Sequence, residues 1–129
     1  MLLYHYTDKD LKILSIGYFG LNAYTSNDKK YAIKRLFFYD TIQPKEYLLK
    51  SSQYRYAVAI NEGDIYNLDN DILNLKAKFN YDIDKILQYI KDNFIGCCYD
   101  VGFLCYCIFD DIIPIKKAIY NKGQYETIS

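Results

Sequence analysis

Tryptophan is absent from this sequence, and histidine occurs once, as His5. An excess of charge of one sign is also lacking, because 16 lysines and arginines balance 16 aspartates and glutamates. Small proteins that bind nucleic acid usually carry a net positive charge that attracts phosphates. The balance therefore disfavours nucleic acid as the partner, although transfer of a group to a nucleotide stays open as a weaker alternative.

Long hydrophobic runs are missing as well. No apolar segment approaches the roughly 18 to 20 residues that a helix needs to cross a bilayer. The N-terminal residues Met1–His5 contain neither a basic segment nor a small-residue cleavage site of the kind that ends a secretory signal. We expect a protein without membrane segments that is located in the cytoplasm.

The residues that are present suit a folded domain. The chain has 129 residues, of which 51% are hydrophobic and 25% charged, and no linker rich in proline, glycine or serine divides it. We predict a single α+β domain over residues 1–129, with residues 124–129 as a flexible tail. Sixteen tyrosines are either the product of A/T-rich codons or a surface for binding a partner.

Four cysteines lie within one apolar stretch, residues 95–109. Tetrahedral zinc sites use pairs of cysteines on turns with two to four residues between them, and the pattern C-C followed by C-x-C does not match that spacing. In a strand, Cys105 and Cys107 share one face. We expect them to be reduced core residues, and we expect no metal site.

Hydrophobic periodicity and turn residues predict the order of the elements. The clearest helix covers residues 81–94, where apolar side chains recur on one face. A second helix is expected at about 27–37, after an N-cap cluster at 26–28. Residues 65–80 are predicted to be a loop with one short helix. The predicted strands are 2–7, 21–25, 54–60, 96–100, 103–109 and 112–120.

The order of the polar residues is informative. A first strand ends in His5-Tyr6-Thr7, a glycine-containing loop follows, Tyr24 lies on the second strand, and Tyr31 lies in the next helix. This arrangement resembles the ADP-ribosyltransferase-like superfamily. It is most similar to the H-Y-E/D branch, which includes small phage proteins that inactivate host defence enzymes.

The resemblance continues near the C-terminus. Residues 96–100 are similar to the glycine-led strand of the family, which carries its acidic residue, and Asp100 occupies that place. The family more often has glutamate there. Asp100 also fits the simpler interpretation of a turn residue that bonds its own backbone.

The resemblance implies a compact fold with a split β-sheet core and short flanking helices, and it implies NAD as substrate. By this likeness His5 bonds the ribose of NAD, the Tyr6 backbone holds the carboxamide, and Thr7 contributes a hydroxyl. Tyr24 and Tyr31 stack on the nicotinamide ring, unless they are core tyrosines.

The reaction implied is mono-ADP-ribosylation of a macromolecule, with His5, Tyr24 and Asp100 as the catalytic residues. A carboxylate at Asp100 would stabilise the positive charge that develops on the ribose. The expected acceptor is a host protein, such as a defence factor that a phage or mobile element inactivates. The alternative is a catalytically inactive module that binds a host protein through its tyrosine-rich surface.

Overall fold

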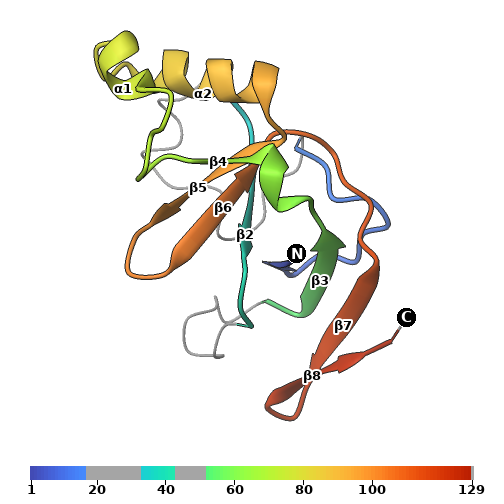
Figure 1. Cartoon of the computed structure of the whole chain (residues 1–129). Helices are drawn as coiled ribbons and strands as arrows, with labels where there is room; N and C mark the ends of the chain where they lie inside the picture. Colours follow the sequence, from blue (N-terminus) through green and yellow to red (C-terminus); the bar gives the residue numbers. More distant parts are fainter. Residues whose placement is uncertain (17–32, 43–51, 129) are drawn as a thin grey trace.

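The computed structural model describes residues 1–16, 33–42 and 52–128, and Figure 1 shows a twisted sheet with helices packed against one end of it. Within these residues, eight strands form one sheet in the order β4-β5-β6-β2-β1-β3-β7-β8. The pair β4 and β5 is parallel, and the other neighbours are antiparallel. The strands are β1 Leu2–Thr7, β2 Leu36–Tyr39, β3 Tyr54–Ala59, β4 Ile65–Asn67, β5 Gly96–Asp100, β6 Leu104–Ile108, β7 Lys116–Asn121 and β8 Gln124–Thr127.

Two α-helices belong to the described part of the chain, α1 Leu75–Lys78 and α2 Ile83–Asn93, and a 3₁₀ turn covers Glu62–Asp64. The side chain of Asp82 caps α2 by accepting a hydrogen bond from the Lys85 N–H. Neither helix has the length and apolar character that a membrane crossing requires. The predicted α+β class is confirmed by this mixture of strands and helices.

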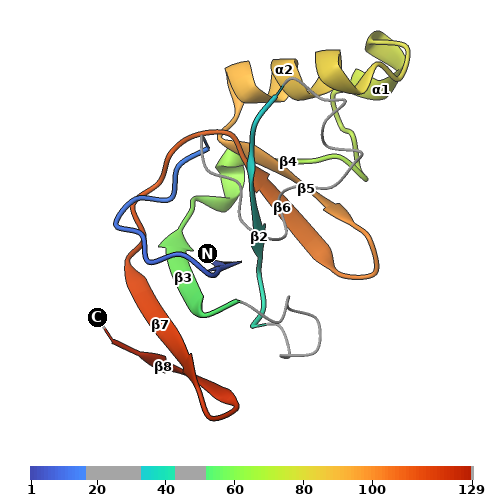
Figure 2. The ribbon, with the colours of Figure 1, turned by 180° about the vertical axis from the view of Figure 1, so that it is seen from behind.

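One face of the sheet, which we call the helix face, carries Cys97 and Cys107 against α2. The residues that pack with the helices come from β2, β4, β5 and β6, so α1 and α2 cover that half of the face. In Figure 2, the view from behind, the β7–β8 hairpin again lies at the end of the molecule opposite the helices. The other half of the helix face, over β1, β3, β7 and β8, therefore lies outside the helix cover.

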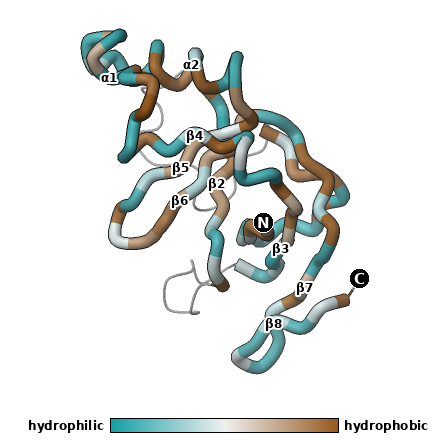
Figure 3. The backbone as a smooth tube through the Cα atoms, in the orientation of Figure 1, coloured by the Kyte–Doolittle hydropathy of each residue, from teal (hydrophilic) through white to brown (hydrophobic). Residues whose placement is uncertain are grey.

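The opposite face, which we call the loop face, carries Leu3, Val58 and Ile108 in a second buried cluster. Leu14 belongs to this cluster, and it exchanges two backbone hydrogen bonds of 2.9 Å with Ile112. These bonds join the segment after β1 to the segment after β6. In Figure 3 brown predominates in β6 and the tip of the β7–β8 hairpin is teal, in agreement with a core in the middle of the sheet.

Five sequence predictions agree closely with the structure, namely β1, β3, α2, β5 and β6. The predicted strand 21–25 and residues 27–32 of the predicted helix lie outside the described residues. The end of that helix prediction is wrong, because Leu36 and Phe37 belong to β2. The four residues of β2 are buried or half-buried, as in a strand that has a neighbouring strand on each side.

The region predicted as loop at 65–80 contains β4 as well as α1, and β7 begins at Lys116, later than expected. The predicted tail at 124–129 is wrong for Gln124–Thr127, which pairs with β7 as β8. Lys122 and Gly123 have positive φ values of 49° and 91°. Such a pair matches the tight turn that joins two antiparallel strands.

Candidate functional site

The backbone ladder between the central strands β1 and β2 ends near His5. β1 pairs with β3 along its whole length. On the other side of β1, the register with β2 consists of Tyr4 opposite Tyr39. At His5, Tyr6 and Thr7 the ladder between β1 and β2 therefore has no further pair among the described residues. We call this unpaired part of the ladder the interval.

The pattern of hydrogen bonds fixes the direction of the β1 backbone at this interval. Met1 and Ile60 exchange two backbone hydrogen bonds, of 3.1 and 2.9 Å. Such pairs alternate along an antiparallel ladder, so the backbone groups of His5 and Thr7 point toward β3. The N–H and C=O of Tyr6 point toward β2, and the Tyr6 main chain therefore borders the interval.

His5 is anchored across the same interval by its side chain. Its Nδ1 lies 2.7 Å from the carbonyl oxygen of Phe37, on β2. Its ring centroid is 5.2 Å from that of Phe38, and only 2% of the residue is exposed. The imidazole thus joins the two strands where the backbone ladder does not.

The chemistry of His5 follows from this contact. A carbonyl only accepts, so Nδ1 carries the proton. Burial lowers the pKa of His5 below its ordinary value of 6.5, and the bond to Phe37 only partly opposes this shift. The ring is therefore neutral at pH 7, and Nε2 is a hydrogen-bond acceptor. It is buried and has no partner among the described residues, which is an uncommon state for a buried polar atom.

Tyr6 and Thr7 are both buried, on opposite faces of the sheet. The ring of Tyr6 lies on the helix face, with centroid distances of 6.1 Å to Tyr39 and 5.6 Å to Tyr125. Thr7 lies on the loop face with His5, and its Oγ1 accepts a hydrogen bond from the Lys9 N–H. His5 and Thr7 thus share a face, and Tyr6 contributes its main chain at this position.

Asp100 ends β5 and is exposed. Its Oδ1 accepts a 2.7 Å hydrogen bond from the Gly102 N–H, and its own N–H donates to Asp69. Gly102 has a φ of +100°, which a glycine adopts readily. Asp100 therefore also holds the turn between β5 and β6.

The structure does not bring Asp100 into contact with His5. The pairing of Phe38 with Tyr106, and of Tyr106 with Cys98, places Cys98 and hence Asp100 on the loop face. β6 and β2 lie between β5 and β1. Three strand spacings of roughly 4.8 Å separate the two strands by about 14 Å. The two residues share a face, but the separation of their strands is larger than the single ribose to which the resemblance assigns both.

The two remaining predicted site residues, Tyr24 and Tyr31, lie outside the described residues. The sequence places them in the segment that precedes β2. Their assignment to ring stacking stays a prediction.

All four cysteines are buried, which confirms their prediction as core residues, and none is disulfide-bonded to another. Burial raises the pKa of Cys98, so its thiol stays protonated and is a weak nucleophile. Over residues 1–16, 33–42 and 52–128, no three histidine, cysteine, aspartate or glutamate side chains gather as metal ligands would.

Two features of this region were not foreseen from the sequence. The Phe37 carbonyl is a backbone group 32 positions from His5, and no residue type marks it in advance. Arg55 packs its guanidinium over the rings of Tyr4 and Tyr125, at 5.5 and 5.2 Å from their centroids. Arginine occurs only twice in the chain, and this scarcity was the one sequence feature that could have drawn attention to Arg55.

Comparisons with family models, with curated proteins and with solved structures give no significant match to this chain.

Proposed function

We propose that this protein is an NAD-dependent mono-ADP-ribosyltransferase that modifies a macromolecule, in the first place a host protein. One observation carries the proposal: a neutral, buried His5 whose Nε2 accepts no hydrogen bond from any described residue, beside an interval between two central strands. The reaction is inferred from the resemblance of the sequence to the H-Y-E/D branch. We also propose that the sheet forms the split core of that family.

The ribose next to nicotinamide is the group that His5 suits. A neutral Nε2 accepts a hydrogen bond from a sugar hydroxyl, whereas an imidazolium could only donate. The bond to Phe37 holds the ring in the tautomer that leaves Nε2 as the acceptor. By the resemblance, the main chain of Tyr6 is assigned to the carboxamide of nicotinamide, which carries one acceptor and two donor hydrogens.

In the proposed reaction, the bond between C1 of this ribose and the nicotinamide nitrogen breaks. The electron pair leaves with nicotinamide, which becomes neutral, and positive charge develops on the ribose. An acceptor group of the target then bonds to C1 and loses its proton. Tyr24 and Tyr31 are assigned to stacking on the leaving ring, and Asp100 to stabilising the developing charge.

A specific observation favours a second candidate function. The Asp100 carboxylate already serves the turn at Gly102, some 14 Å from β1 across the strands. A catalytically inactive module would keep such a residue for folding alone. In that case the protein would inhibit its host target by binding through tyrosine side chains.

Transfer of labelled ADP-ribose distinguishes the two functions. The protein is incubated with NAD labelled in the adenylate half and with lysates of candidate host cells, beside a His5→Asn variant. We expect a discrete labelled band with the wild type, and at least a 100-fold weaker band with the variant. Equal labelling by both proteins would remove His5 from the mechanism. Absence of labelling in every lysate would favour the binding module.

A further inference from the structure

A small pocket opens on the half of the helix face that α1 and α2 do not cover. It has a cavity volume of about 110 Å³, and Tyr4, Arg55, Lys116 and Thr127 contribute to its walls. A water needs roughly 10 to 15 Å³ of such volume, so the pocket has room for a group of several heavy atoms. Its floor contains Ala57 and Ala118, whose short side chains leave this part of the sheet hollow.

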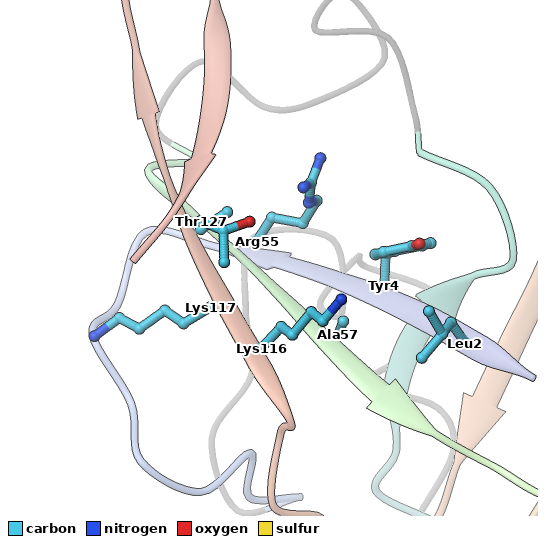
Figure 4. Close-up of a pocket in the computed structure, with 8 residues that line it drawn as sticks. Leu2, Tyr4, Arg55, Ala57, Lys116, Lys117 and Thr127 are labelled. Atoms are coloured by element: carbon cyan, nitrogen blue, oxygen red, sulfur yellow. The ribbon is translucent and has the colours of Figure 1, made fainter. Parts of the chain in front are cut away.

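The register explains why these side chains meet. Tyr4 pairs with Ala57, Ala57 with Lys116, and Arg55 with Ala118. Figure 4 shows Tyr4, Arg55 and Lys116 on the same side of the sheet, with Lys117 pointing away. The pocket thus collects side chains from β1, β3, β7 and β8.

Of the three cations that line this pocket, Arg55 and Lys116 are not neutralised by the described residues. Arg55 and Lys116 form no ion pair within the described ranges, while Lys117, on the loop face, is paired with Asp10. The residues that line the pocket include no aspartate or glutamate. Burial raises the pKa of Tyr125 to about 12, so its phenol is neutral and leaves the charge of Arg55 uncompensated.

Arg55 is also positioned in advance for binding. Its guanidinium lies over both Tyr4 and Tyr125, and these contacts restrict the side chain while its N–H groups remain donors. A planar fork of donors beside a second cation and a threonine hydroxyl matches the oxygens of a phosphoryl group. The ammonium of Lys116 adds a second positive charge and can donate to phosphoryl oxygens from several directions.

We propose that this pocket binds a phosphoryl group, either as free phosphate or as the phosphomonoester end of a small molecule. The site is separate from the proposed NAD site. Tyr4 and Arg55 project from the helix face, whereas the imidazole of His5 lies on the loop face with Phe38. The pocket can therefore be tested whether or not the protein cleaves NAD.

Residue-resolved titration tests the proposal. The uniformly ¹⁵N-labelled chain is titrated with inorganic phosphate at low ionic strength, followed by amide chemical shifts, with Arg55→Gln and Lys116→Gln as test variants. Lys91→Gln, on the exposed side of α2, removes the same charge away from the pocket. Phosphate should shift the amides of Arg55, Lys116 and Thr127. Each test variant should weaken binding about tenfold, and Lys91→Gln should bind as the wild type does.

Further arms identify the ligand. Glycerol 3-phosphate that binds more tightly than phosphate would point to a phosphomonoester, and weaker binding would point to free phosphate; both results support the pocket. Acetate should bind much more weakly than phosphate. Absence of shifts at the pocket, equal weakening by Lys91→Gln, or equal binding of acetate would overturn the proposal. Lys116 is exposed and makes no described ion pair, so its variant tests the pocket even if Arg55→Gln fails to fold.

Discussion

His5 Nδ1 donates a 2.7 Å hydrogen bond to the backbone carbonyl of Phe37. The contact crosses from β1 to β2 beyond Tyr4 opposite Tyr39, the one ladder pair that the described residues form between these strands. It fixes both the tautomer of His5 and the position of Nε2. The proposed role of His5 depends on this one contact.

Stability should depend on pH through His5. Burial places its folded-state pKa below 6.5, so between the two values the unfolded chain binds more protons than the folded chain. Stability is therefore full above about pH 6.5 and falls as the pH decreases toward the folded-state pKa, by at most about 1.4 kcal/mol per pH unit. Urea unfolding between pH 7.5 and 5.5 measures this slope.

His5→Asn is the matched control for that measurement. Asparagine can donate from Nδ2 to the Phe37 carbonyl but has no group that titrates in this range. Because His5 is the single histidine, the variant should lose most of the pH dependence between 7.5 and 5.5. An unchanged slope would show that other groups produce it.

Binding of NAD should raise the melting temperature of the wild type. A ligand that binds only the folded state stabilises it by about 2.7 kcal/mol at 100 times its Kd. Tyr24→Ala should reduce the shift by removing the proposed stacking, and His5→Asn should reduce it by removing the acceptor for the ribose. Equal shifts in all three proteins, or no shift at millimolar NAD, would contradict these roles.

Substitution of Gly96 should destabilise the fold. An added Cβ would collide with the backbone carbonyl of Cys107 and would lie 2.9 Å from Cδ1 of Ile108. Overpacking of this kind typically costs about 1 to 3 kcal/mol, so thermal unfolding of Gly96→Ala should shift down by several degrees. In Gly63→Ala the new Cβ meets Asn61 at an ordinary 3.5 Å. That control should melt close to the wild type, and a similar loss in both variants would contradict the packing argument.

Asp100 separates the two candidate functions. Asp100→Asn keeps an oxygen that can accept from the Gly102 N–H, so the fold and NAD binding should survive. If the carboxylate acts on the charge that develops on the ribose, nicotinamide release should fall about 100-fold. Steady-state kinetics measure this loss. Full activity in the variant would assign Asp100 to the turn alone.

The sequence was informative wherever a local pattern decides the structure. The apolar stripe of α2 and the alternation in β3 predicted those elements. β2 was missed because a short apolar run has no period that separates a buried strand from a helix. β8 was missed because Gln124 and Glu126 are polar, as residues of an exposed edge strand can be.

The candidate site was predictable only in part, for a related reason. His5 stands out as the single histidine within a strand-like segment. Its partner is the main chain of Phe37, and its environment depends on β1 and β2 meeting, so neither is encoded in residues near His5. The pocket around Arg55 likewise exists only after β1, β3, β7 and β8 align.

Release of nicotinamide from NAD tests the central claim most directly. Purified wild type and His5→Asn are incubated with NAD, with and without extract of candidate host cells, and free nicotinamide is quantified by chromatography. We predict that the wild type releases nicotinamide and that His5→Asn does so at least 100-fold more slowly, while both proteins show the same cooperative unfolding. No release by the folded wild type under either condition, or equal release by both proteins, would contradict the account.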